Sequence, residues 1–177
     1  MRTKLQPYLS LALLALHVPV FAQVCDPDVQ RTAASYNFTI MHDDLVKDNR
    51  TGLIWTRCVS GETWRGDRCL STSDDPDHGE YTWKEALEYA AASQRGGYTD
   101  WRLPNIKELN SIVEYACYGP ALDQTIFDFS TLVFSSTGAR QKEDKYGYVL
   151  GIYFHEGDWN TMKRTRHSHV LLVREAE

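Results

Sequence analysis

Residues 82–113 read TWKEALEYAAASQRGGYTDWRLPNIKELNSIV, and this stretch decides the fold because it contains two helix starts. Thr82 with Glu85 has the spacing of a capping box, in which a hydroxyl and a carboxylate each satisfy a free backbone donor. Asn105, after Pro104, with Glu108 makes a second cap. Apolar residues recur at helical spacing behind each start: Trp83, Ala86, Leu87, Ala90 and Ala91, then Ile106, Leu109, Ile112 and Val113. The stretch therefore predicts two helices, each with one buried face.

The segments on either side of these helices have strand patterns. Alternating or continuous apolar residues mark candidate strands at residues 36–40, 45–47, 53–55, 132–134, 146–154 and 170–173. Turn residues 48–52 join the second and third of these into a hairpin. Residues 60–80 are polar and glycine-rich, and we expect a long loop there. The order of strands, two helices and strands predicts an α+β fold with two helices packed against an antiparallel sheet.

The N-terminus has the pattern of a secretory signal peptide. Arg2 and Lys4 precede an apolar run over residues 9–20, and Ala22 follows as a small residue at a cleavage site. We expect cleavage after Ala22, which leaves residues 23–177 as one globular domain in the periplasm or outside the cell; an uncut anchor is the alternative. The apolar run is short for a membrane span, and no later segment is apolar enough to span.

The charge of the chain is acidic, and this disfavours two classes of partner. The net charge is −5, and loss of the two positive residues near the start takes it from −5 to −7. Nucleic acid and anionic membrane are therefore poor default partners.

The chain has four cysteines, and all lie beyond the predicted cleavage site. An even number in an exported chain indicates two disulfides, for which three pairings are possible. We favour Cys58–Cys69, which closes a short loop, and Cys25–Cys117, which ties the N-terminal segment to the middle of the domain. A zinc site is the alternative, but the spacing lacks the short-spaced pairs that zinc prefers.

Three motifs resemble a known family. They are VKDNRTGLIW at residues 46–55 before Arg57-Cys58, DWRLPN at 100–105 before KEL at 107–109, and FSST at 134–137. Together they resemble the Lcl C-terminal domain-like family, a bacterial exported domain, over about residues 44–174. The family is named for a collagen-like adhesin whose C-terminal domain binds sulfated glycans, so the resemblance implies a glycan-binding or envelope-associated module.

The chain departs from that family pattern at two positions. Phe134 stands where the family usually has Trp, and Leu171 replaces the first Arg of a Val-Arg-Leu-Val-Arg strand. A glycan contact made by that Arg is therefore not carried over. The Ala-rich helix followed by Arg102-Leu103-Pro104 and a second helix is also similar, more distantly, to the C-type lectin-like fold, which supports the same architecture.

Residues 162–169 contain the one concentrated basic run. Lys163, Arg164, Arg166 and His167 make it the candidate ligand-binding site for sulfated or carboxylated glycans, with a solvated loop as the alternative. Lys142 and Lys145 lie in another polar loop.

Other clusters carry weaker indications of chemistry. Residues 74–80 and 157–160 are oxygen-rich, but neither has the ligand spacing of a calcium site. His167 and His169 share one face of a strand, yet no third ligand accompanies them. Trp101 is expected in the core, with Arg102 in a fork to a carboxylate such as Glu108 or Glu85. The sequence therefore predicts no metal and no cofactor.

Three functions remain open at this point. The first is a non-catalytic binding module for an anionic glycan or a cell-envelope partner. The second is a structural or accessory envelope protein, such as a pilus- or secretion-associated subunit. The third is a hydrolase, which no catalytic motif in the chain supports.

Overall fold

A computed structural model describes residues 23–42, 44–72, 79–140 and 147–176. Two α-helices lie in this part of the chain, α1 (Trp83–Ala92) and α2 (Ile106–Ser111). The strands are β1 (Val24–Cys25), β2 (Phe38–His42), β3 (Leu45–Asp48), β4 (Leu53–Thr56), β5 (Glu62–Arg65), β6 (Arg68–Ser71), β7 (Glu80–Tyr81), β8 (Cys117–Tyr118), β9 (Leu132–Ala139), β10 (Tyr148–Tyr153), β11 (Asp158–Lys163), β12 (Ser168–His169) and β13 (Val173–Glu175).

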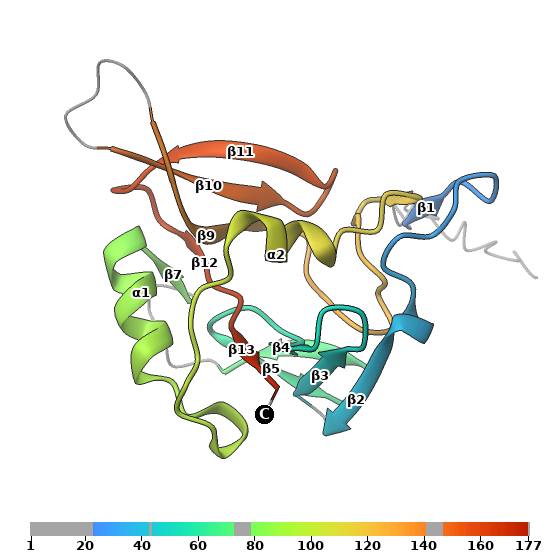
Figure 1. Ribbon diagram of the computed structural model, residues 1–177, viewed down its shortest axis with the longest axis horizontal. Helices are drawn as coiled ribbons and strands as arrows, with labels where there is room; N and C mark the ends of the chain where they lie inside the picture. Colours follow the sequence, from blue (N-terminus) through green and yellow to red (C-terminus); the bar gives the residue numbers. More distant parts are fainter. Residues whose placement is uncertain (1–22, 43, 73–78, 141–146, 177) are drawn as a thin grey trace, which may run out of the picture.

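Two main sheets build the molecule, and they lie one above the other in Figure 1. One has five strands in the order β11-β10-β9-β12-β7, and the other has four in the order β13-β4-β3-β2. β1 pairs with β8, and β5 pairs with β6, in two small sheets. Pairing is antiparallel except where β12 meets β9, with His169 opposite Val133. The fold is therefore mixed α and β, with a largely antiparallel pattern.

Each helix belongs to a hydrophobic core that joins both sheets. Ile106 and Leu109 of α2 are buried with Trp55 of the four-stranded sheet and with Val133 and Ile152 of the five-stranded sheet. Helix α1 contributes to a second core, with these buried residues: Ala86 and Ala90 of α1, Leu45 and Ile54 of the four-stranded sheet, and Phe134, Val149 and Met162 of the five-stranded sheet. Burial of apolar surface in two shared cores holds the sheets together.

The helix starts were predicted correctly, because both caps are local. Capping boxes are present at Thr82–Glu85 and Asn105–Glu108, and the side chain of Asn105 accepts from two backbone amides of α2. The hairpin of β3 and β4 was also predicted. Helix α2 is shorter than its apolar stripe, since Ile112 and Val113 follow its end yet are buried.

The prediction of a long loop over residues 60–80 is wrong for residues 62–71. Strands β5 and β6 form a hairpin whose turn contains Gly66 at φ 71°. The hairpin is anchored by Trp64, which is buried, and by the backbone amide of Cys69, which donates to Asp128 at 2.8 Å.

The predicted strand over residues 170–173 is wrong for its first three residues. This buried segment crosses from β12 in one sheet to β13 in the other. Side chains replace ladder partners: Val170 N–H donates to Ser60 Oγ at 2.9 Å, and Leu172 N–H donates to Thr56 Oγ1 at 3.2 Å. The segment is therefore hydrogen-bonded without being a regular strand.

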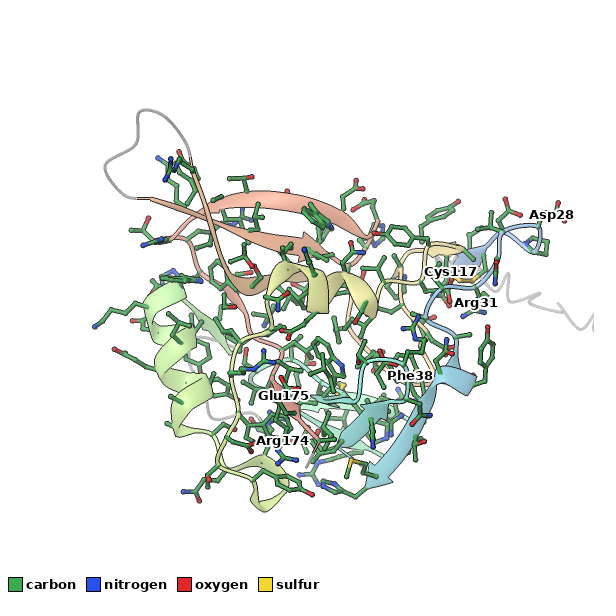
Figure 2. All side chains as sticks on the ribbon, viewed as in Figure 1. Asp28, Arg31, Phe38, Cys117, Arg174 and Glu175 are labelled. Atoms are coloured by element: carbon green, nitrogen blue, oxygen red, sulfur yellow. A yellow bond between two sulfur atoms is a disulfide. The ribbon has the colours of Figure 1, made fainter. Side chains whose placement is uncertain are left out.

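The structure contains both favoured disulfides, Cys25–Cys117 and Cys58–Cys69. The first holds the small β1–β8 sheet, which protrudes from one end of the molecule; Figure 2 shows Cys117 there, near Arg31. The C-type lectin-like fold stays a prediction. No helix in the described ranges has both the length and the apolar character needed to cross a membrane.

Several predictions fall on residues that the structure does not describe. The signal peptide over residues 1–22, Lys142, Lys145 and most of the acidic segment 74–80 lie outside the described residues.

Candidate ligand-binding site

The predicted basic residues lie where the chain leaves β11 and turns toward β12. A backbone hydrogen bond from Arg166 N–H to Lys163 O, at 3.0 Å, closes this turn. The side chain of Arg164 packs on Trp83, with its guanidinium 4.5 Å from the centre of the indole ring. Trp83 is the first residue of α1, so this cation–π contact holds the turn against that helix. Lys163 is the exposed last residue of β11.

Arg166 and His167 line a hollow of about 300 Å³ on the five-stranded sheet. We call it the Arg166 hollow. Its lining comes from several strands and loops: Glu80, Thr131, Leu132, Tyr153, Asn160, Arg166, His167 and Ser168. Lys163 and Arg164 are not among these, so the structure divides the predicted basic run into two groups.

The walls of the hollow are fixed by the surrounding structure. Tyr153 is stacked on His155 with 5.9 Å between ring centres, and His155 Nδ1 lies 3.1 Å from Ser130 Oγ. Ser168 is buried, and its hydroxyl donates to Leu132 O at 2.7 Å, which ties β12 to β9. A side chain that is already held loses little rotamer freedom when a ligand binds.

The charges around the hollow are of both signs. Among the residues that the structure describes, the Arg166 guanidinium has no ion-pair partner. Glu80 of β7 lies opposite His169 of β12, with 3.6 Å between Glu80 Oε1 and His169 Nε2. Burial lowers the pKa of His169 below its usual value, against the raising effects of Glu80 and the Gly79 backbone. The hollow therefore offers a cation in the β11–β12 turn, without an ion-pair partner in the described chain, and a carboxylate on β7.

The Arg102 fork was predicted correctly and is structural. Its two terminal nitrogens donate to the carboxylate of Glu108 at 2.8 and 2.9 Å, and one of them also donates to Glu175 at 2.6 Å. Burial alone would raise the pKa of Glu108, but the hydrogen bonds from Arg102 and from the Asn105 backbone outweigh it and lower that pKa. Trp101 is a core residue as expected, 3% exposed.

The histidine pair does not converge on a metal site. His167 is exposed, whereas His169 is half-buried beside Glu80. Within the described ranges, no three His, Cys, Asp or Glu side chains gather closely enough to hold a metal ion. The residues at 157–160 form the turn into β11 and its first positions.

Sequence reasoning missed most of the hollow. Tyr153 was placed in a strand but not in a site, Asn160 was named only within the oxygen-rich stretch 157–160, and Thr131 was not singled out. Asn160 lies opposite Gly151 across the β10–β11 ladder, and Tyr153 lies opposite Asp158. Only the pairing of β10 with β11 puts these side chains on one face, and β11 itself was not predicted.

The two disulfides, the helices packed on sheets and the Arg166 hollow define a disulfide-stapled α/β domain with a polar surface hollow. The chain belongs to the Lcl C-terminal domain family, whose model matches residues 44–174. Among curated proteins, no match to the chain was found. Membership of this family points to an accessory or binding domain.

Proposed function

We propose that this protein is a non-catalytic binding module that recognises an anionic glycan in the Arg166 hollow. The observation that carries the proposal is the convergence of Arg166 and His167 with Tyr153 and Asn160 around one hollow. Polar groups that converge with an aromatic ring in a concave site are typical of ligand recognition.

The chemistry of the lining suits a sulfated or carboxylated sugar. A guanidinium has five N–H donors in a fixed fork and forms charge-assisted, bidentate hydrogen bonds with an anionic group. Glu80 repels an anion but accepts hydrogen bonds from sugar hydroxyls. A sugar with its anionic group at Arg166 and a hydroxyl at Glu80 therefore matches both charges of the hollow. Tyr153 would then lie beside the sugar ring.

The two disulfides support a site of action outside the cytoplasm. Such bonds persist in oxidising compartments and are rare in the cytosol. Both join cysteines of the described chain, Cys25 to Cys117 and Cys58 to Cys69. We propose the periplasm or the cell exterior as the compartment.

The experiment is binding of the oxidised domain to a panel of sulfated, carboxylated and neutral glycans at low and high salt. Arg166→Gln removes the cation of the hollow, and Arg65→Gln removes an exposed cation from the separate β5–β6 hairpin. We expect saturable binding of anionic glycans that weakens with salt. Arg166→Gln should lose about tenfold in affinity or more, as expected for one charge-assisted contact, while Arg65→Gln binds like the wild type. Absence of binding, or equal losses in both variants, would contradict the proposal.

A second candidate function is an accessory subunit that docks on an envelope protein. A hollow of about 530 Å³ beside the Cys25–Cys117 disulfide favours it, because Val24, Val29 and Tyr118 there are 48%, 42% and 57% exposed. Exposed apolar patches of this kind mark protein interaction sites. Co-purification of one envelope protein with the wild type, and its loss with Tyr118→Ala, is the result expected for this candidate.

A further inference from the structure

Three uncharged polar or aromatic side chains meet on the α2 side of the five-stranded sheet. They are Trp159 of β11, Asn110 of α2 and Tyr115 of the segment after α2. Trp159 Nε1 donates to Asn110 Oδ1 at 2.6 Å, and the hydroxyl of Tyr115 donates to the same oxygen at 2.7 Å. Both rings are 52% exposed. We call this group the Trp159 platform.

The hydrogen-bonding capacity of the platform is only half used. An indole N–H is solely a donor, so the atom of Asn110 that faces Trp159 is the amide oxygen. Its two lone pairs are occupied by Trp159 and Tyr115. In the described part of the chain, the amide nitrogen of Asn110 has no partner, and it is not among the buried, unsatisfied atoms. The platform therefore presents two free N–H donors and a phenol oxygen that can still accept.

The two rings are held in place rather than free to rotate. The indole is tied to α2 through its nitrogen, and its residue lies opposite Ile152, which is fully buried. Trp159 belongs to neither hydrophobic core, and a held ring binds a ligand at small entropic cost. Trp and Tyr in such positions contribute strongly to binding.

We propose that the Trp159 platform binds an uncharged sugar ring. The C–H face of a pyranose matches the electron-rich face of an aromatic ring, while its hydroxyls match the donors of Asn110 and the acceptor of Tyr115. No member of the platform carries a charge, so this site selects a neutral unit of a glycan. It does not depend on the Arg166 hollow, to which none of its residues contributes.

The test is calorimetric titration of the oxidised domain with neutral oligosaccharides, namely the hexamers of glucose, xylose, mannose and N-acetylglucosamine. We expect at least one to bind with Kd on the order of 1 mM or tighter, with little change between low and high salt, because no ion pair is formed. Trp159→Ala should weaken that binding about tenfold or more, and Trp159→Phe less. Tyr36→Ala is the matched control, because Tyr36 is 73% exposed elsewhere on the molecule and should leave the affinity unchanged.

Several results would overturn the proposal. Failure of all four sugars to bind would do so, as would binding that Trp159→Ala leaves intact. If Trp159→Ala loses an envelope protein from a pull-down while no sugar binds, the platform is a protein contact instead. Arg166→Gln separates this site from the proposed function: it should leave neutral binding intact, whatever it does to anionic binding.

Discussion

At the residue scale, one buried carboxylate organises the N-terminal part of the domain. Glu114 is fully buried, and it accepts hydrogen bonds from the backbone amides of Thr32, Ala33 and Ala116 at 3.0 to 3.1 Å. Arg31 Nε lies 2.8 Å from its Oε2. Burial alone would raise the pKa of Glu114, but Arg31 and the three amides outweigh burial and lower it.

Replacement of this carboxylate should be costly. We expect Glu114→Gln to reduce the free energy of unfolding by about 2 to 4 kcal/mol. Arg31 loses the Glu114 carboxylate as a partner, and the side-chain NH2 that replaces one carboxylate oxygen cannot accept a hydrogen bond from the backbone donor that faces it. Urea unfolding at pH 7 measures the loss. Glu156→Gln, at an exposed carboxylate, is the control and should change little. A loss of unfolding free energy as small as that of Glu156→Gln would show that the hydrogen bonds of Glu114 do not stabilise the fold.

The same residue gives a pH dependence with a definite sign. Since its folded pKa is lowered, the Glu114 contribution is fully present above the unfolded value of about 4.3 and is lost as the pH falls through the folded pKa. The difference in unfolding free energy between wild type and Glu114→Gln should therefore shrink as the pH is lowered below about 4. A difference that grows on acidification would contradict this.

Gly151 is required because two groups approach its α-carbon closely. A Cβ there would overlap the carbonyl oxygen of Val133 and the methyl of Met162. We expect Gly151→Ala to destabilise the protein by about 1 to 3 kcal/mol, since a strand backbone has to shift. Gly138→Ala is the matched control on the neighbouring strand, where the atom nearest to the new Cβ would be Arg164 Nη2 at 3.5 Å. Thermal melting of both variants measures the difference; equal melting temperatures would contradict the prediction.

At the element scale, the two disulfides close loops of very different length. Cys58 and Cys69 are 11 residues apart, and Cys25 and Cys117 are 92 apart. If a disulfide stabilises mainly by restricting the unfolded chain, the disulfide that closes the longer loop contributes more to the free energy of unfolding. The expected contributions are about 4 to 5 kcal/mol for Cys25–Cys117 and about 2 to 3 kcal/mol for Cys58–Cys69.

Serine variants of each pair test this ordering. We expect Cys25→Ser/Cys117→Ser to lose more unfolding free energy than Cys58→Ser/Cys69→Ser, as measured by denaturation in guanidinium chloride. The reverse order would mean that native contacts of the β5–β6 hairpin, such as the Trp64 packing, outweigh loop entropy.

The elements that could be predicted from sequence are those with local signals. Both helix starts follow from caps four residues long, and the β3–β4 hairpin follows from its turn. The β5–β6 hairpin was missed because its residues are polar apart from Trp64 and Leu70, and its anchor to Asp128 is a long-range contact. β11 was missed because Met162 is its single buried residue on an edge strand.

At the scale of the whole molecule, the two sheets share both hydrophobic cores. Trp55 lies in one core and Trp101 in the other, and each core contains residues from both sheets. We therefore expect one cooperative unfolding transition. Tryptophan fluorescence and far-UV circular dichroism should give coincident curves in urea; two separated transitions would contradict a shared core.

The candidate site also depends on how the whole molecule packs. The basic run was visible in the sequence, but the separation of Arg164, stacked on Trp83, from Arg166 depends on the turn between β11 and β12. The Trp159 platform joins α2 to a strand 49 residues away. No local pattern predicts contacts of that kind, because they depend on tertiary packing.

Residue-resolved NMR of the ¹⁵N-labelled, oxidised domain tests the central claim most directly, with a heparin-derived oligosaccharide as the anionic ligand. If the Arg166 hollow binds anionic glycans, amide signals around it should shift saturably, at Thr131, Tyr153, Asn160 and residues 166–168. These shifts should be lost in Arg166→Gln. Shifts confined to other surfaces, or no shifts at low salt, would contradict the claim.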